Sequence, residues 1–123
     1  MLEAYSLNVA AASNSAIPFN STSVLKGCSA THPSPDTFEL NKCGVYMVEV
    51  DASAAASTTL QLYKNGVALP MAQSTGLTPS FTTLVQVDKN NTCCACSSPT
   101  SLQVFNSTAT TLTNANIVIT KVC

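Results

Sequence analysis

The feature that most constrains this chain is the shortness of its apolar runs. Apolar and β-branched residues occur in short runs separated by turn residues, and no long segment repeats its apolar residues with the 3.6-residue period of a helix. The runs predicted to be strands are 5–10, 16–19, 23–25, 37–40, 45–51, 59–63, 67–69, 81–87, 101–105 and 116–122. A chain of 123 residues can form one domain with one modest core. The sequence therefore predicts a single all-β domain, a sandwich or a barrel.

Turn residues predict where these strands end. Asn65-Gly66 is the strongest signal, because both residues accept the positive φ of a type I′ hairpin turn. Four further segments are predicted to be loops: 27–36, 51–59, 73–79 and 88–99. The two prolines of the first loop are expected to keep it out of a sheet, and Pro70 is expected to end the strand that follows the hairpin turn.

The strands differ in how they distribute apolar residues between their two faces. In 45–51, Tyr46 points to the same side as the valines at 48 and 50, which predicts one buried face. Strands 101–105 and 116–122 are apolar on both faces. Two apolar faces indicate either that a neighbouring subunit covers the sheet or that an ordinary inner strand exposes a few apolar side chains.

The low charge of the chain excludes several classes of partner. Charged residues make up 9% of the chain, the formal net charge is -1, and arginine is absent. No nucleic acid is expected as a partner, because phosphate binding needs clustered Lys and Arg side chains. No membrane partner is expected either, since no stretch approaches the roughly 18 apolar residues of a spanning helix. The N-terminal residues lack the cationic start and apolar core of a signal peptide, which favours synthesis in a cytosol without export by the usual route.

Several short motifs, taken in order, resemble those of C1q- and TNF-like jelly-roll domains. Residues 38–46 resemble the F-x-L-x-x-x-G-x-Y strand-turn-strand, and 60–66 resemble the L-x-L-x-x-N-G hairpin. Residues 81–87 and 116–121 are similar to the apolar strand that follows and to the closing strand. Ile17-Pro18-Phe19-Asn20 resembles the bacterial and phage branch of the family. Each motif is short, so the resemblance rests on their order and spacing.

The resemblance implies a two-sheet jelly-roll sandwich of about ten strands that packs as a homotrimer. It places the jelly-roll domain at 16–123 and leaves 1–15 as an N-terminal segment, either an attachment or a first strand. Aromatic and aliphatic residues of the main strands are the candidate subunit contacts: Tyr46, Phe81, Phe105, Val118 and Val122. For the aromatic residues, together with Tyr63, core packing or subunit contact is the preferred interpretation, and a ligand pocket is the alternative.

Cysteines are the most informative single residue type. The chain has six, all of them candidates for disulfides: Cys28, Cys43, Cys93, Cys94, Cys96 and Cys123. In a jelly roll of this type, all but Cys28 should fall at one pole. Disulfides are the preferred interpretation, within or between subunits, and the sequence does not choose among the fifteen pairings that six cysteines allow. A zinc site of Cys43, Cys94, Cys96 and Cys123 is the alternative, although its spacing is unusual, and free thiols are the third.

No arrangement of side chains indicates an enzyme or a cofactor. His32, the only histidine, lies near Asp36 without a nucleophile to serve. Glu49 and Asp51 share one strand face, where a solvated surface is the preferred interpretation and a calcium site the alternative. The sequence contains none of the common hydrolase, nucleotide-binding or zinc-protease motifs.

These observations lead to two functional hypotheses. The first is a structural virion protein, a trimeric decoration or head-fibre protein on a phage capsid, with the virion surface as its location and other virion proteins as partners. The second is the receptor- or glycan-binding tip of a phage fibre or of a bacterial cell- or spore-surface filament, with a host-surface glycan as ligand. The loop tips at 53–57 and 73–78 are small and polar, which favours the first hypothesis.

Overall fold

The computed structural model describes residues 1–27, 29–87 and 100–122, and within these ranges the chain forms strands and connecting turns without a helix. None of these residues therefore belongs to a helix that could cross a membrane. The strands are β1 (Leu2–Ala11), β2 (Ser15–Ala16), β3 (Ser21–Leu25), β4 (Ala30–Ser34), β5 (Thr37–Leu40), β6 (Gly44–Ala54), β7 (Thr58–Lys64), β8 (Val67–Gly76), β9 (Ser80–Val87), β10 (Thr100–Asn106) and β11 (Thr110–Lys121).

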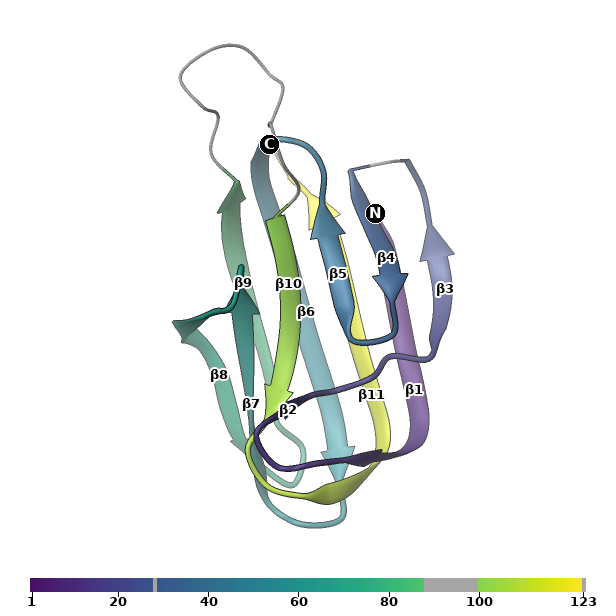
Figure 1. The fold of residues 1–123 in the computed structure, drawn as a ribbon, viewed down its shortest axis with the longest axis vertical. Helices are drawn as coiled ribbons and strands as arrows, with labels where there is room; N and C mark the ends of the chain where they lie inside the picture. Colours follow the sequence, from purple (N-terminus) through teal and green to yellow (C-terminus); the bar gives the residue numbers. More distant parts are fainter. Residues whose placement is uncertain (28, 88–99, 123) are drawn as a thin grey trace.

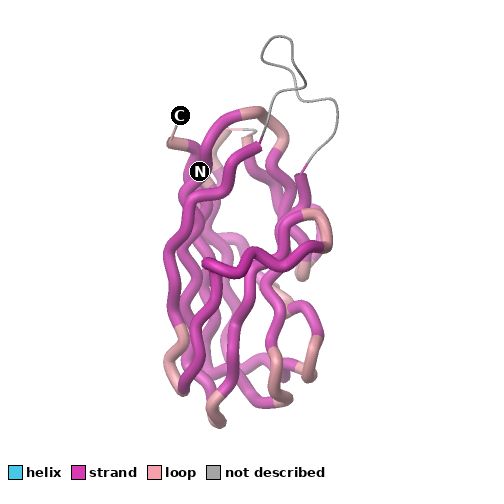
Figure 2. Tube along the Cα trace, turned by 90° about the vertical axis from the view of Figure 1, so that its left-hand side faces the viewer, coloured by secondary structure: helices cyan, strands magenta, loops and turns pink. Residues whose placement is uncertain are grey.

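The strands form two antiparallel sheets packed face to face (Figure 1). A five-stranded sheet has the order β3-β1-β11-β6-β9, and a six-stranded sheet has the order β4-β5-β10-β7-β8, with β2 added beside β10. Figure 2 shows the two layers from the side. The predicted all-β, two-sheet sandwich is confirmed, with eleven strands in the described part of the chain against about ten predicted.

The core lies between the sheets and is made by the alternate residues that point inward. In β6, Tyr46, Val48 and Val50 are fully buried while Glu49 is exposed, as the alternation predicted. Phe19 and Phe38 meet edge to face in this core, with ring centroids 5.5 Å apart. Because each sheet buries only its inner face this way, the outer faces remain available for function.

The N-terminal residues belong to the sandwich. Residues 2–11 form β1, which lies between β3 and β11 in the five-stranded sheet and pairs with β11 over most of its length. Leu2 and Ala4 are fully buried in the core. This part of segment 1–15 is therefore a first strand of the fold.

Two proline-containing segments predicted to lie outside strands are strands. β4 contains Pro33, and β8 continues through Pro70 to Gly76. Both strands are at edges of the six-stranded sheet, and each shifts register near its proline. The pairing of β4 with β5 shifts between Thr31 and Ser34, and the pairing of β8 with β7 shifts between Gln61 and Tyr63. Edge strands and bulges tolerate proline because its nitrogen need not donate to a neighbour there.

The tract 51–59 was also predicted to be a loop, but only 55–57 connect the strands. β6 runs to Ala54 and β7 begins at Thr58. The backbone N–H of Ala52 donates to the Pro79 carbonyl at 3.1 Å, and that of Ala54 donates to the Leu77 carbonyl at 2.7 Å. These hydrogen bonds favour the strand despite the low strand propensity of alanine.

The predicted hairpin is confirmed. β7 and β8 pair antiparallel across the turn, with Lys64 opposite Val67. Asn65 has a φ of 51° and Gly66 a φ of 80°, the left-handed backbone that a type I′ turn requires. The Asn65 side-chain oxygen also accepts the Ser101 backbone N–H at 2.9 Å, which ties the turn to β10.

Candidate functional site

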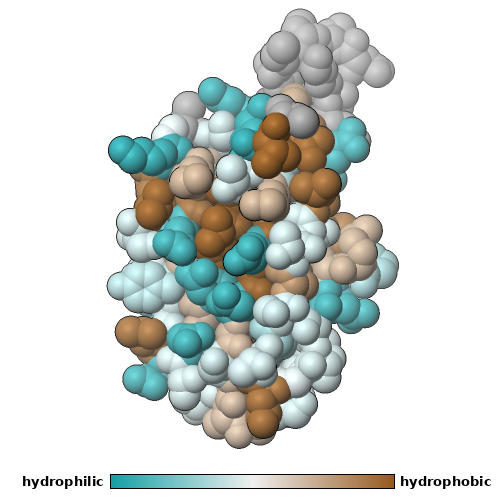
Figure 3. Space-filling view, turned by 180° about the vertical axis from the view of Figure 1, so that it is seen from behind, coloured by the Kyte–Doolittle hydropathy of each residue, from teal (hydrophilic) through white to brown (hydrophobic). Residues whose placement is uncertain are grey.

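The outer face of the five-stranded sheet carries a cluster of apolar side chains, the aliphatic patch: Val45, Met47, Leu84, Val118 and Val122. Met47 lies directly opposite Leu84 on β9, and the Val122 backbone N–H donates to the Val45 carbonyl at 2.8 Å. Leu84 is 63% exposed and Val122 is 48% exposed. Figure 3, which views the molecule from behind, shows apolar side chains gathered toward one end of this face. Such a grouping is unusual on an outer face.

The candidate subunit contacts occupy three different environments. Val118 and Val122 lie in the aliphatic patch, whereas Phe81 packs against the core. Phe105 lies on the outer face of the other sheet, so no single face includes it and Val118. The prediction that Tyr46 contacts a second subunit is wrong, because its side chain is fully buried within its own chain.

Tyr46 has a structural role between the sheets. Its hydroxyl donates to the Lys42 carbonyl at 2.7 Å and to the Ser29 carbonyl at 3.2 Å. Burial raises the pKa of Tyr46 above its ordinary value of 10.0, and the two hydrogen bonds act in the opposite direction. The side chain thus joins β6 to the segments that precede β4 and follow β5.

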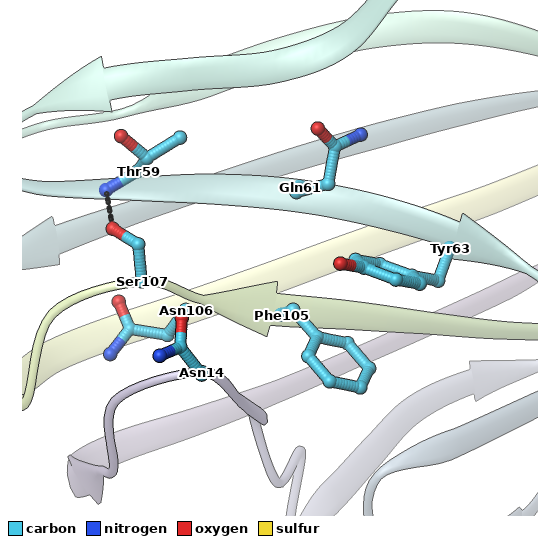
Figure 4. A pocket seen from close by; sticks show the side chains of 7 residues that line it. All are labelled: Asn14, Thr59, Gln61, Tyr63, Phe105, Asn106 and Ser107. Atoms are coloured by element: carbon cyan, nitrogen blue, oxygen red, sulfur yellow. Dashed lines mark hydrogen bonds between the residues drawn. The ribbon is translucent and has the colours of Figure 1, made fainter. Parts of the chain in front are cut away.

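A second feature is a cavity of about 330 Å³ on the outer face of the six-stranded sheet (Figure 4). Its lining comes from three segments: Thr59, Gln61 and Tyr63 on β7, Phe105, Asn106 and Ser107 at the end of β10, and Asn14 in the turn after β1. The lining contains aromatic, amide and hydroxyl groups and no charged side chain.

The aromatic side of this cavity is a cross-strand pair. Tyr63 lies opposite Gln103, and Phe105 lies opposite Gln61, so the two rings are diagonal neighbours on one face. Their centroids are 4.2 Å apart and their planes are tilted by 32°. Gln103 donates to Thr37 on β5, on the other side of β10 from Tyr63.

Buried Asn106 holds the base of the cavity. Its side-chain oxygen accepts a short hydrogen bond from the Thr58 hydroxyl, and its nitrogen donates to the Thr108 carbonyl at 2.5 Å. The same nitrogen lies 3.5 Å from the carbonyl oxygen of Ala11 and 3.4 Å from that of Ala12. One side chain therefore fixes both the β10–β11 connection and the turn that carries Asn14.

The other residues considered for chemistry lie apart from the cavity. His32 stacks on Phe38 with centroids 4.3 Å apart, and its ring nitrogens contact the Thr22 hydroxyl at 3.0 Å and the Pro35 carbonyl at 3.1 Å. Glu49 and Asp51 lie on the outer face of β6. In the described ranges no three His, Cys, Asp or Glu side chains gather as a metal site would require.

The segments that carry the cysteines lead toward one end of the sandwich. Gly44 pairs with Val87, Thr100 pairs with Leu40, and Val122 bonds to Val45. Cys43 is not a free thiol. Cys28, Cys93, Cys94, Cys96 and Cys123 lie outside the described residues, so the disulfide pairing and the zinc alternative stay predictions.

The segment before β4 also leads to this end, which was not predicted from the sequence. The Asn41 N–H donates to the Ser29 carbonyl at 2.7 Å, and Ala30 pairs with Leu40. The strand β4 that creates this pairing was predicted to be a loop. It was not predicted as a strand because Pro33 and Pro35 favour a loop.

Comparisons with known proteins identify the fold. No protein-family model and no curated protein sequence matches this chain. Among solved structures, the globular domain of zebrafish complement 1qA protein superposes with a TM-score of 0.77 at 13% identity, covering 99% of this chain and 96% of that one. Rabbit GITRL, of the TNF family, gives a TM-score of 0.61 at 12% identity, covering 100% and 95%. The chain has the C1q/TNF-like jelly-roll fold, as predicted.

Proposed function

We propose that this chain is a non-enzymatic structural module that assembles as a homotrimer through the outer face of its five-stranded sheet. The observation that carries the proposal is the aliphatic patch. An outer sheet face in contact with water normally carries polar residues, and apolar side chains that adjoin each other there indicate a covered surface. In the patch, Met47 adjoins Leu84 and Val45 adjoins Val122, whereas Val118 lies between Glu3 and Glu49 on the neighbouring strands.

A second copy of the same chain is the partner that best fits the patch. The resemblance to C1q- and TNF-like domains implies a homotrimer, and the fold agrees with that resemblance. Leu84 and Val122 project far enough from the sheet, at 63% and 48% exposure, to be buried by a neighbour. Burying apolar side chains of this kind stabilises an assembly by roughly 25 cal/mol for each Å² removed from water.

The assembly is tested by the mass of the purified protein in light scattering. We expect three chains for the wild type and one chain for Leu84→Glu, because an unpaired buried carboxylate costs several kcal/mol in each interface. The matched control is Val67→Glu. Val67 is 66% exposed on β8 of the other sheet, so this variant should keep the mass of three chains. A wild-type monomer would overturn the proposal.

For the place of this assembly we propose the surface of a phage virion, with a bacterial cell or spore surface as the alternative. The low charge of the chain and the resemblance of residues 17–20 to the phage branch support a particle coat. Immunogold labelling of purified particles tests this location: label on the capsid is expected. Label confined to cells or spores would favour the alternative.

The cysteines are proposed to form disulfides that stabilise the same assembly. A non-reducing denaturing gel of the oxidised protein distinguishes the two arrangements. A three-chain band would indicate links between subunits, and a one-chain band would exclude them. Each link would stabilise the fold by roughly 2–4 kcal/mol.

A further inference from the structure

The cavity on the outer face of the six-stranded sheet has the chemistry of a site for an uncharged ligand that is apolar on one side and rich in hydroxyl groups at its edge. Its volume of about 330 Å³ is at the lower end of the range of roughly 300–1,000 Å³ for small-molecule sites. From this geometry we infer that the cavity binds one ring of a neutral saccharide. The inference goes beyond the proposed assembly and does not depend on it.

The aromatic pair supplies the apolar side. Tyr63 and Phe105 are both half-buried, and their rings lie 4.2 Å apart on one face of the sheet. Aromatic rings provide a large, rigid contact area with little loss of side-chain entropy on binding. One face of a pyranose ring presents C–H groups, and this face packs well on an aromatic surface.

Polar groups around the pair can satisfy the ring hydroxyls. Within the described residues, the Tyr63 hydroxyl and the Asn14 amide have no hydrogen-bond partner. The Gln61 amide nitrogen donates to the Leu69 carbonyl at 2.5 Å and the Ala72 carbonyl at 3.2 Å. The Gln61 carbonyl oxygen is therefore fixed and remains an acceptor.

The site is held in place before any ligand binds. Asn106 anchors the turn that carries Asn14, and the Thr59 N–H donates to the Ser107 hydroxyl at 3.0 Å, which joins the ends of β7 and β10. A preorganised site binds more tightly because less conformational entropy is lost on binding.

The absence of charge from the lining selects among ligands. A nucleotide, a phosphate or an acidic sugar would find no cation to neutralise it. A hydrocarbon ligand would leave the Tyr63 hydroxyl, the Asn14 amide and the Gln61 carbonyl oxygen without partners. A neutral sugar satisfies both the rings and the polar groups. The cavity is on the opposite sheet from the aliphatic patch, so it stays open when that patch is covered.

The test is a titration of the wild-type protein with four sugars, followed by NMR chemical shifts. The sugars are the methyl glycosides of glucose, galactose, mannose and N-acetylglucosamine. We expect at least one to bind with a Kd on the order of 1 mM, as for a small contact area, with the shifts centred on β7 and the end of β10.

Three variants locate the binding. Phe105→Ala should weaken it by about tenfold or more, because half of the aromatic surface is lost. Tyr63→Phe removes only the hydroxyl and should weaken binding by about threefold to tenfold. Tyr5→Ala is the control, since Tyr5 is a half-buried aromatic on β1 of the other sheet and should leave binding unchanged.

Binding that is weakened in Tyr63→Phe and unchanged in Tyr5→Ala supports the site, even if Phe105→Ala fails to fold. No binding of any of the four sugars overturns the inference. Tighter binding of N-acetylneuraminic acid or of adenosine, measured in the same way, also overturns it, because the lining would then serve another ligand class.

Discussion

The outer faces of the two sheets differ in chemistry, although the same alternation of inward and outward residues builds both. The five-stranded sheet presents the aliphatic patch, in which Met47 and Leu84 face each other across neighbouring strands. The six-stranded sheet presents the cavity, in which Tyr63 and Phe105 form a cross-strand pair surrounded by amides and hydroxyls. The first face suits another protein surface, and the second suits a small polar ligand.

This difference shows that a β-sandwich can specialise its two surfaces separately. Inward residues such as Val48 and Leu62 determine the packing of the core. Outward residues between them change without altering that packing, because successive side chains of a strand point to opposite faces. The six-stranded face depends in addition on polar anchors, above all Asn106 and Gln61, whose hydrogen bonds hold its edges.

The largest expected effect comes from Asn106→Leu, which tests the dependence of the six-stranded face on its buried anchor. Leucine would leave the Thr58 hydroxyl and the Thr108 carbonyl without their present partner. Because unpaired buried polar groups are costly, we expect the free energy of unfolding to fall by about 3 kcal/mol. Urea denaturation measures this value.

The matched variant on the other sheet is Asn116→Leu. Asn116 lies on the outer face of β11, and within the described residues its side chain forms no hydrogen bond. We expect a change within about 0.5 kcal/mol. Equal losses in the two variants would show that the two faces do not differ in this respect.

A smaller effect is expected for Tyr46→Phe, which removes the hydroxyl that joins the five-stranded sheet to the segments beside β5. The loss of hydrogen bonds to Lys42 and Ser29 should lower the free energy of unfolding by about 1–2 kcal/mol. Tyr63→Phe is the control, and it should leave stability nearly unchanged because the Tyr63 hydroxyl has no partner within the described residues.

The raised pKa of Tyr46 predicts that the stability of the protein depends on pH. Folding raises the pKa of Tyr46 above 10.0, so the folded state favours the protonated hydroxyl. The stabilisation is therefore complete below about pH 10 and is lost as the pH rises through the raised pKa. In urea denaturation on either side of pH 10, the wild type should lose more stability than Tyr46→Phe. Parallel losses would contradict this assignment.

The smallest effect compares two asparagines with the same backbone. Asn65 on the six-stranded sheet and Asn8 on the five-stranded sheet both have a φ of 51°. Glycine tolerates this backbone at either position, so Asn→Gly isolates the side chain. Asn65→Gly should cost about 0.5–1 kcal/mol because its oxygen accepts the Ser101 N–H. Asn8→Gly should change thermal unfolding little, and a larger loss there would reverse the comparison.

Several elements could be predicted from the sequence because their signals are local. The Asn65-Gly66 turn needs only its own two residues, and the alternation in β6 needs only its own strand. The β4 and β8 strands could not be predicted in this way. Whether Pro33 or Pro70 is compatible with a strand depends on whether that strand lies at a sheet edge, which is a property of the whole sheet.

The candidate site was only partly predictable. Val118 and Val122 were identified as contacts from the two apolar faces of their strand, and both lie in the aliphatic patch. Tyr46 was included wrongly, because an aromatic residue has the same sequence signal in a core as at an interface. Tyr63 and Phe105 were noted separately. The only sequence signal that they share a face is that each alternates along its strand, β7 or β10, with residues predicted to point into the core.

By itself, the sequence determined that this chain is an all-β domain, a sandwich or a barrel, with one hairpin of known type and few charged residues. These properties follow from residue periodicity and turn chemistry, which act over a few residues. Only the tertiary structure decided which strands lie at edges, which apolar residues are left outside, and that Asn14 meets Tyr63 and Phe105 in one cavity. Pairing between distant strands creates these neighbours, and register over the whole sheet sets that pairing.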